Sequence, residues 1–135
     1  MLRGLSTATY WADDLEAAAA WYTQVLGIEP YFVRPGYTEF RVGDYQDEFG
    51  LVDRRYAPPG TASGPSGAIV YWHVDDVPAT LTRLLSLGAK EHQPPTDHQG
   101  GGFVTASVID PFGNILGIMY NPHYVEVLEA VKPTL

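Results

Sequence analysis

The residues best suited to bind a ligand or move a proton recur at every second position in three stretches of this sequence, and Trp11 is a further single candidate. Tyr37, Glu39 and Arg41 form one stretch, and Tyr71 and His73 form another. Successive side chains of a β-strand point to opposite faces, so this spacing places each set on one face of a sheet. An imidazole can also act as a general base near neutral pH. The predicted ligand-binding set is Trp11, Tyr37, Glu39, Arg41, Tyr71, His73, Thr105 and Ser107.

Each of these groups also has a purely structural interpretation. His73 can fill a polar corner, and Glu39 and Arg41 can form an exposed ion pair, which would contribute little to stability. Glu48 could substitute for a metal ligand or an acid, but the sequence supplies no partners for it. Aromatic side chains on such a face can line either a small-molecule pocket or a subunit interface. Three further candidates lie in or next to residues 94–102, which we predict to be a solvated loop: His92, Asp97 and His98.

An internal repeat indicates which elements position these residues. Residues 12–15 (Ala-Asp-Asp-Leu) are similar to residues 74–77 (Val-Asp-Asp-Val), and a Leu-Gly pair at 26–27 recurs at 87–88. In each copy an amphipathic stretch follows the aspartates, which can cap a helix, and the glycine can end it. These patterns predict helices at 14–26 and 77–87. They predict strands at 4–11, 28–33, 37–42, 47–53, 68–73, 89–93, 103–109 and 115–120.

The predicted fold class is α+β, with two βαβββ modules that form a curved mixed sheet and carry their helices on its outer face. One strand face is uniformly apolar, as in Val70, Trp72 and Val74, and is expected to be buried beneath the helices. The mixed opposite face can meet water or line a pocket. We predict a single domain over 1–135, with modules at about 1–56 and 67–122, a linker at 57–66 and a tail at 123–135 that includes a short helix at 124–131.

Composition narrows the class of protein. The 135 residues include no cysteine, which excludes disulfides and thiolate metal sites, and a cytoplasmic location is predicted. The N-terminal residues lack the apolar core of a signal peptide, and no apolar run is long enough to span a membrane. A net charge of −8 disfavours nucleic acid and favours a cationic ligand.

The ordered motifs resemble the vicinal oxygen chelate superfamily, which includes glyoxalases, bleomycin-resistance proteins and extradiol dioxygenases. The resemblance rests on the repeated strand–Asp-Asp–helix–Leu-Gly pattern, on residues 71–77 (Tyr-Trp-His-Val-Asp-Asp-Val) and on residues 110–120, which begin Asp-Pro-Phe-Gly-Asn. It implies that a divalent metal would be held at four positions along the strands. In this chain those positions are Thr7, Gly50, Ile69 and Gly117, none of which is a usual ligand.

The sequence therefore favours a metal-free protein that binds a small molecule, without a cofactor. The resemblance implies a style of function like that of bleomycin-resistance proteins, which sequester a drug in an aromatic-lined groove, and a twofold homodimer. Neither a nucleic acid nor a membrane is expected as a partner. The alternative is an enzyme of the same superfamily, of lyase, isomerase or oxygenase type, that uses His73 and nearby polar residues or a non-standard metal site.

Overall fold

The computed structural model describes residues 1–98 and 100–131, which fall into two compact units. Unit 1 comprises Met1–Gly64 and Phe112–Asn114, and unit 2 comprises Pro65–Pro111 and Ile115–Leu135. Gln99, in the predicted polar loop, and residues 132–135, in the predicted tail, lie outside the described residues. That the two units form one domain stays a prediction. No helix within the described ranges is long and apolar enough to cross a membrane.

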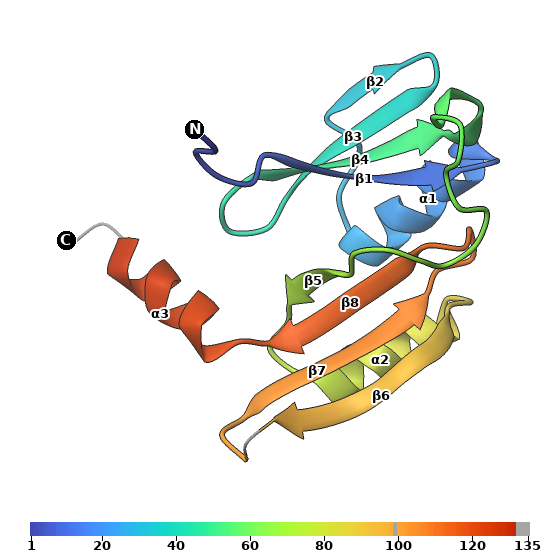
Figure 1. Cartoon of the computed structure of the whole chain (residues 1–135). Coiled ribbons are helices and arrows are strands. Elements are labelled where there is room, and N and C mark those ends of the chain that lie inside the picture. The colour runs from blue at the N-terminus through green and yellow to red at the C-terminus, as the bar shows by residue number, and fades with distance from the viewer. Residues whose placement is uncertain (99, 132–135) are drawn as a thin grey trace. The chain divides into compact units, whose positions relative to one another are not determined.

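Unit 1 is a βαβββ module built around a four-stranded mixed sheet (Figure 1). Its elements are β1 (Thr7–Ala12), α1 (Leu15–Leu26), β2 (Phe32–Arg34), β3 (Tyr37–Val42) and β4 (Asp47–Asp53), followed by a short 3-10 turn, η1 (Arg54–Tyr56). The strand order is β1-β4-β3-β2. β1 runs parallel to β4, whereas β3 is antiparallel to both β4 and β2.

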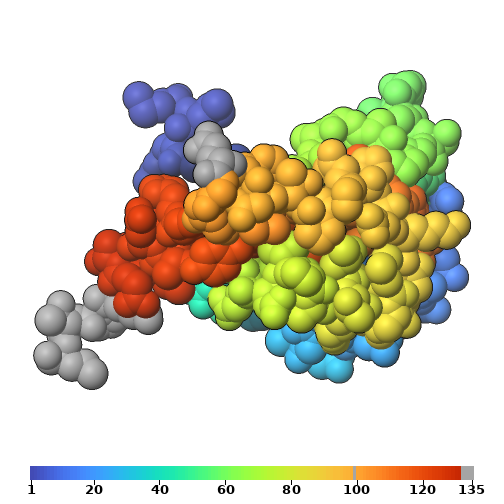
Figure 2. Space-filling model, turned by 90° about the horizontal axis from the view of Figure 1, so that it is seen from below, coloured from blue at the N-terminus to red at the C-terminus, as the bar shows by residue number. Residues whose placement is uncertain are grey.

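Unit 2 repeats the same topology, which confirms the predicted α+β class with two βαβββ modules. Its elements are β5 (Val70–His73), α2 (Val77–Ser86), β6 (Lys90–His98), β7 (Phe103–Ile109) and β8 (Ile115–Tyr120), followed by α3 (Pro122–Val131). The strand order is β5-β8-β7-β6, again with one parallel pair, β5 and β8. Figure 2 shows α2 in yellow-green beside β6 in yellow at the surface of this unit.

Matching caps start the two main helices. Asp14 accepts a hydrogen bond from the backbone N–H of Ala17 at 3.1 Å, and Asp76 accepts one from that of Ala79 at 3.0 Å. Each carboxylate thereby satisfies an N–H that has no partner within the helix. α1 ends at Gly27, whose φ of +70° is a conformation that glycine adopts without steric cost. The repeated Asp-Asp motif thus predicted both helix starts correctly.

The side of each sheet that faces its helix is the core, but the two cores differ in chemistry. In unit 1, Phe49 is almost fully buried, and its ring centroid lies 4.9 Å from that of Tyr22 and 5.3 Å from that of Tyr10. In unit 2 the buried apolar residues are aliphatic: Val77, Leu81, Leu84, Ala89, Ala106, Val108, Ile115, Leu116 and Ile118. One module is therefore held by interlocking aromatic rings and the other by branched side chains.

Three sequence predictions need correction. β6 continues to His98, so residues 94–98 are strand rather than the predicted loop, and its pairing with β7 includes two register irregularities around Gln93. β2 begins only at Phe32, four residues after the predicted start. Val70, Trp72 and Val74 are half-buried rather than buried, because β5 is an edge strand of its sheet. The predicted C-terminal helix is present as α3, which has no buried residue.

Candidate functional site

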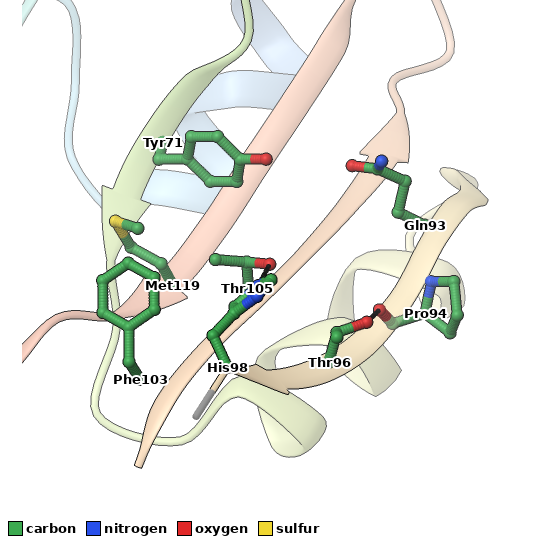
Figure 3. Close-up of a pocket in the computed structure, with 8 residues that line it drawn as sticks. All are labelled: Tyr71, Gln93, Pro94, Thr96, His98, Phe103, Thr105 and Met119. Atoms are coloured by element: carbon green, nitrogen blue, oxygen red, sulfur yellow. Dashed lines mark hydrogen bonds between the residues drawn. The ribbon is translucent and has the colours of Figure 1, made fainter. Parts of the chain in front are cut away.

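The candidate site is a pocket of about 430 Å³ on the face of the unit 2 sheet that points away from α2 (Figure 3). We call this face, and the corresponding face of unit 1, the open face. All four strands of the sheet contribute to the pocket, and the volume lies within the usual range of small-molecule sites. The lining residues are Tyr71 of β5, Gln93, Pro94, Thr96 and His98 of β6, Phe103 and Thr105 of β7, and Met119 of β8.

The pairing of the strands explains why these side chains converge. Thr105 is paired with Met119 on one side and with Thr96 on the other, and His98 is paired with Phe103. Paired residues on neighbouring strands project to the same face, so alternate positions of β7 face the pocket. On β6 the register irregularity also brings the adjacent Gln93 and Pro94 to it. The intervening residues, such as Ala106 and Val108, are buried on the opposite face.

Apolar and polar groups lie on separate sides of the pocket. In Figure 3, Tyr71, Met119 and Phe103 form one wall. The other wall carries Gln93 and Thr96 on β6. This separation orients any bound molecule, with its apolar body toward the aromatic rings and its polar edge toward β6.

Hydrogen bonds fix the orientation of several polar side chains in and beside the pocket. The fully buried hydroxyl of Ser107 donates to Oε1 of Gln93 at 3.1 Å, which leaves the two N–H donors of that amide for the pocket. His98 Nε2 lies 2.8 Å from Oγ1 of Thr105, and the hydroxyl of Thr96 donates to the carbonyl of Pro94 at 3.1 Å. Among the described residues the other ring nitrogen of His98 has no hydrogen-bond partner, and although the ring of Phe103, 5.5 Å away between centroids, packs against this imidazole, no third polar group orients it.

The predicted binding residues of unit 2 have three different positions. Tyr71 and Thr105 line the pocket directly, and Ser107 supports it by orienting Gln93. His73 is not a lining residue. Its ring stacks on Tyr124 of α3, with centroids 4.5 Å apart and planes inclined by 7°.

His73 instead fixes the start of α3. Its Nδ1 accepts the backbone N–H of Asn121 at 3.1 Å, and the centroid of its ring lies 5.1 Å from that of Tyr120. Its side chain is 9% exposed, and Nε2 has no hydrogen-bond partner within the described residues, the nearest carboxylate oxygen being that of Asp75 at 3.7 Å. The polar-corner interpretation therefore describes His73 better than the general-base interpretation.

The predicted binding set omitted six lining residues, of which only His98 had been considered as a candidate: Gln93, Pro94, Thr96, His98, Phe103 and Met119. The alternation that selected Thr105 also selects Phe103 and Met119, so this signal was available. The β6 residues were hidden because two successive prolines predict a loop. The strand accommodates them at its register irregularities, along the edge of the sheet, where a missing N–H costs no ladder hydrogen bond.

The open face of unit 1 carries acidic groups in place of a neutral pocket. The hydroxyl of Tyr37 donates to Oε1 of the buried Glu39 at 2.6 Å. Burial, this hydrogen bond and the negative charges of Glu39 and Glu48 together raise the pKa of Tyr37 to about 12. The hydroxyl of Thr7 donates to Glu48 at 2.6 Å. Tyr37 is therefore a neutral donor at physiological pH, held against one carboxylate and close to a second.

The other predicted residues of unit 1 do not join this group. Arg41 is exposed and lies over the ring of Tyr31, with 3.7 Å between its guanidinium carbon and the ring centroid. Among the described residues it forms no ion pair with Glu39, so the structural interpretation of these two residues as an exposed ion pair does not hold. The backbone carbonyl of Trp11 accepts a hydrogen bond from the side chain of Asn114 at 3.0 Å.

The four positions at which the resemblance implies metal ligands do not fit a metal. A Cβ atom at Gly50 would lie 2.8 Å from the hydroxyl oxygen of Tyr37, and one at Gly117 would lie 2.7 Å from the ring of Tyr71 and 2.8 Å from Ile69. In each unit a tyrosine ring thus occupies the space that a ligand side chain would need. The described residues also contain no cluster of three or more His, Asp or Glu side chains suited to a metal ion.

A second hollow of similar volume, about 430 Å³, lies in unit 1 beside the start of α1. Its lining includes Leu15, Glu16, Arg34 and the buried Thr38, and it contains none of the predicted binding residues. Thr38 alternates with Tyr37 and Glu39 along β3, so this hollow lies on the helix side of the sheet rather than on the open face. It therefore has no relation to the predicted site.

Two βαβββ modules with a side-chain pocket on an open sheet face define the class of fold, and comparison with known proteins identifies the family. Residues 4–118 match the family model of the Glyoxalase/Bleomycin resistance protein/Dioxygenase superfamily. The chain belongs to this superfamily, which confirms the resemblance seen in the sequence. No curated protein matches the chain.

Solved structures share the fold at low sequence identity. A glyoxalase-related enzyme from Fulvimarina pelagi is 23% identical, with a TM-score of 0.71 over 90% of each chain. A lactoylglutathione lyase from Agrobacterium tumefaciens is 23% identical, with a TM-score of 0.68 over 89% of this chain and 95% of that one. A fosfomycin resistance protein from Mesorhizobium loti is 16% identical, with a TM-score of 0.67 over 94% and 99%. These similarities establish the fold but not the activity, which has to be inferred from the residues of the site.

Proposed function

We propose that this protein binds a small organic molecule without a metal, in the pocket on the open face of unit 2. The observation that carries the proposal is the pocket itself, which combines an aromatic wall with preset hydrogen-bonding groups in about 430 Å³. Such a combination is typical of ligand sites, in which apolar surface supplies affinity and a few polar groups supply orientation. The lack of fit for a metal at Gly50 and Gly117 favours binding over metal-assisted chemistry.

A fragment screen with isotope-labelled protein tests this proposal. Fragments that bind should shift the backbone amide signals of Tyr71, Thr105 and Met119, and ligand at 100 times its dissociation constant should stabilise the fold by about 2.7 kcal/mol. Thr105→Val with Met119→Ala should reduce these shifts, whereas Thr82→Val on the exposed side of α2 serves as a control that leaves them unchanged. A screen that produced no shifts at pocket residues would contradict the proposal.

We also propose that the chain forms a twofold homodimer in the cytoplasm. Closed twofold symmetry is the commonest assembly of soluble proteins, and a stable interface should exceed about 1,000 Å². The exposed rings of Tyr31 and Phe32 supply the kind of surface that interfaces favour. Sedimentation that shows only monomer at micromolar concentration would reject the dimer, and cell fractionation tests the location.

The enzyme alternative has one observation in its favour. His98 and Thr105 form a hydroxyl–imidazole pair in the pocket, at 2.8 Å, and such a pair is the minimum needed to activate a nucleophile. It has no orienting third group among the described residues, and His73, on which this alternative first relied, packs against α3 instead. Covalent labelling of Thr105 by an activated ester, lost in His98→Phe, would favour the enzyme.

A further inference from the structure

The charge of the pocket residues restricts the kind of molecule that can bind. None of the eight lining residues is an aspartate, glutamate, lysine or arginine, although 24 of the 135 residues carry such side chains. A charged group that leaves water for a site without an opposite charge loses hydration that nothing replaces. Apart from the titratable imidazole of His98, the pocket thus offers no charged group to pair with a bound ion, unlike the open face of unit 1 with its two carboxylates.

The shape and chemistry of the two pocket walls restrict the ligand further. Tyr71 and Phe103 offer aromatic surface on either side of Met119, whose thioether interacts favourably with aromatic rings (Figure 3). Across the pocket, the hydrogen bond from the fully buried Ser107 to its carbonyl oxygen orients the amide of Gln93, whose two N–H donors have no partner among the described residues. A molecule that matches both walls has a flat aromatic body and a hydrogen-bond acceptor on one edge.

We infer that the ligand of this protein is an uncharged aromatic or heteroaromatic molecule with an acceptor group that meets the amide of Gln93. This inference rests on the proposed binding function and narrows it to a chemical class. The net charge of −8 suggested a cation from the sequence, but that charge resides outside the lining of this pocket. The residues that line the pocket, rather than the net charge of the protein, determine which ligand charge is favoured, because those residues replace the water around a bound group.

Matched probes test the chemical class. Benzamide, benzoate and benzylamine share one ring and differ in charge, and cyclohexanecarboxamide keeps the amide but loses the flat ring. Titration of labelled protein, followed through the amide signals of Tyr71, Gln93, Phe103 and Met119, should give benzamide an affinity at least about tenfold higher than the other three. Gln93→Leu should weaken benzamide about tenfold and leave toluene unchanged, whereas Gln24→Leu on α1 should change neither.

The possible outcomes separate this inference from the proposed function. Binding of benzoate or benzylamine in the pocket as tightly as benzamide would overturn the chemical class while leaving a binding function in place. Equal binding of benzamide and cyclohexanecarboxamide would overturn the requirement for a flat ring. If no probe and no library fragment shifts the pocket signals, both the chemical class and the binding function are wrong.

Discussion

The two modules share one topology and differ in what their open faces can do. In unit 1 the hydroxyl of Tyr37 meets Glu39 with Glu48 nearby, so the face is acidic and its polar groups already satisfy one another. In unit 2 the lining contains no aspartate, glutamate, lysine or arginine, and the N–H donors of Gln93 have no partner among the described residues. Two modules of the same topology can therefore differ through a few side chains on one sheet face. In unit 1 these side chains form a closed polar network, and in unit 2 they form a pocket.

Both modules nevertheless use the same device at one position. Gly50 and Gly117 each lie beneath a tyrosine ring, that of Tyr37 in unit 1 and that of Tyr71 in unit 2. Glycine is required there because the ring approaches the strand too closely to admit a Cβ atom. In unit 1 the tyrosine is fastened by Glu39, whereas in unit 2 it forms part of a pocket wall. The same packing of tyrosine on glycine thus belongs to a closed polar network in unit 1 and to a pocket wall in unit 2.

The largest expected effect separates the two cores. Phe49→Ala removes a ring that contacts Tyr10 and Tyr22, and should lower the free energy of unfolding of unit 1 by about 4 kcal/mol. Val108→Ala, equally buried in unit 2, removes two methyl groups and should cost about 2 kcal/mol. Urea denaturation followed by residue-specific NMR signals measures both losses. Equal costs would mean that the aromatic and aliphatic cores are not energetically distinct.

The glycine positions should respond unequally to the same change. Gly117→Ala places a Cβ atom 2.9 Å from the backbone oxygen of Val70 as well as against Tyr71, and should cost about 3 kcal/mol. Gly50→Ala meets only side-chain atoms of Tyr37, whose ring can shift by giving up its hydrogen bond to Glu39, and should cost less, about 1 kcal/mol. Thermal or urea unfolding measures both.

A second substitution in each module tests whether the loss of stability in the glycine variants has a steric cause. Tyr37→Ala should relieve the clash in Gly50→Ala, whereas Tyr71→Ala should relieve only part of that in Gly117→Ala because the backbone oxygen remains. Complete rescue in both modules would contradict the role assigned to the backbone oxygen of Val70.

Binding should depend on one open face only. Tyr71→Ala removes part of the aromatic wall and should weaken a pocket ligand about tenfold. Arg41→Ala, which removes the guanidinium group from the exposed ring of Tyr31 in unit 1, should leave that affinity unchanged. Isothermal titration measures both, with sedimentation to check that assembly is intact. If Arg41→Ala also weakens the ligand, the predicted unit 1 residues belong to the binding site.

The titration of Tyr37 reports the acidic network of unit 1. Its pKa of about 12 in the folded protein exceeds the ordinary tyrosine value of 10.0. Its stabilising contribution is therefore complete below pH 10 and is lost as the pH rises from 10 toward 12. Absorbance of tyrosinate should show a late step that Tyr37→Phe removes and Glu39→Gln moves to lower pH. The control Tyr56→Phe should leave that step in place.

The smallest expected effect concerns the exposed hydrogen bond between Thr7 and Glu48. Thr7→Val should lower the free energy of unfolding by about 0.5 kcal/mol, because water competes for both groups at this exposed site. Thr105→Val, which loses the contact with His98 in unit 2, should cost a similar amount. Urea denaturation measures both changes. A cost above about 2 kcal/mol at either site would indicate a buried network rather than a surface contact.

Local patterns in the sequence determined the fold. The repeated Asp-Asp and Leu-Gly motifs predicted two modules because caps and stops act within one helical turn of the residues that form them. Period-two alternation predicted β3, β4, β7 and β8 with the bounds that the structure has, and it identified Tyr71 and Thr105 as facing away from the core.

Only the tertiary structure decided which of those exposed residues form a site. His73 and Tyr71 lie two positions apart on one strand, yet α3 packs against His73 while Tyr71 lines the pocket. Two prolines made the second half of β6 resemble a loop in the sequence. Its pairing with β7 around a register irregularity is a non-local interaction, so no short stretch of sequence could predict it. The sequence by itself determined the elements and the faces, because these follow from nearest neighbours along the chain. The pocket depended on partners supplied by other strands, and α3 covered His73; the positions of these partners are set only when the sheet and helix pack together.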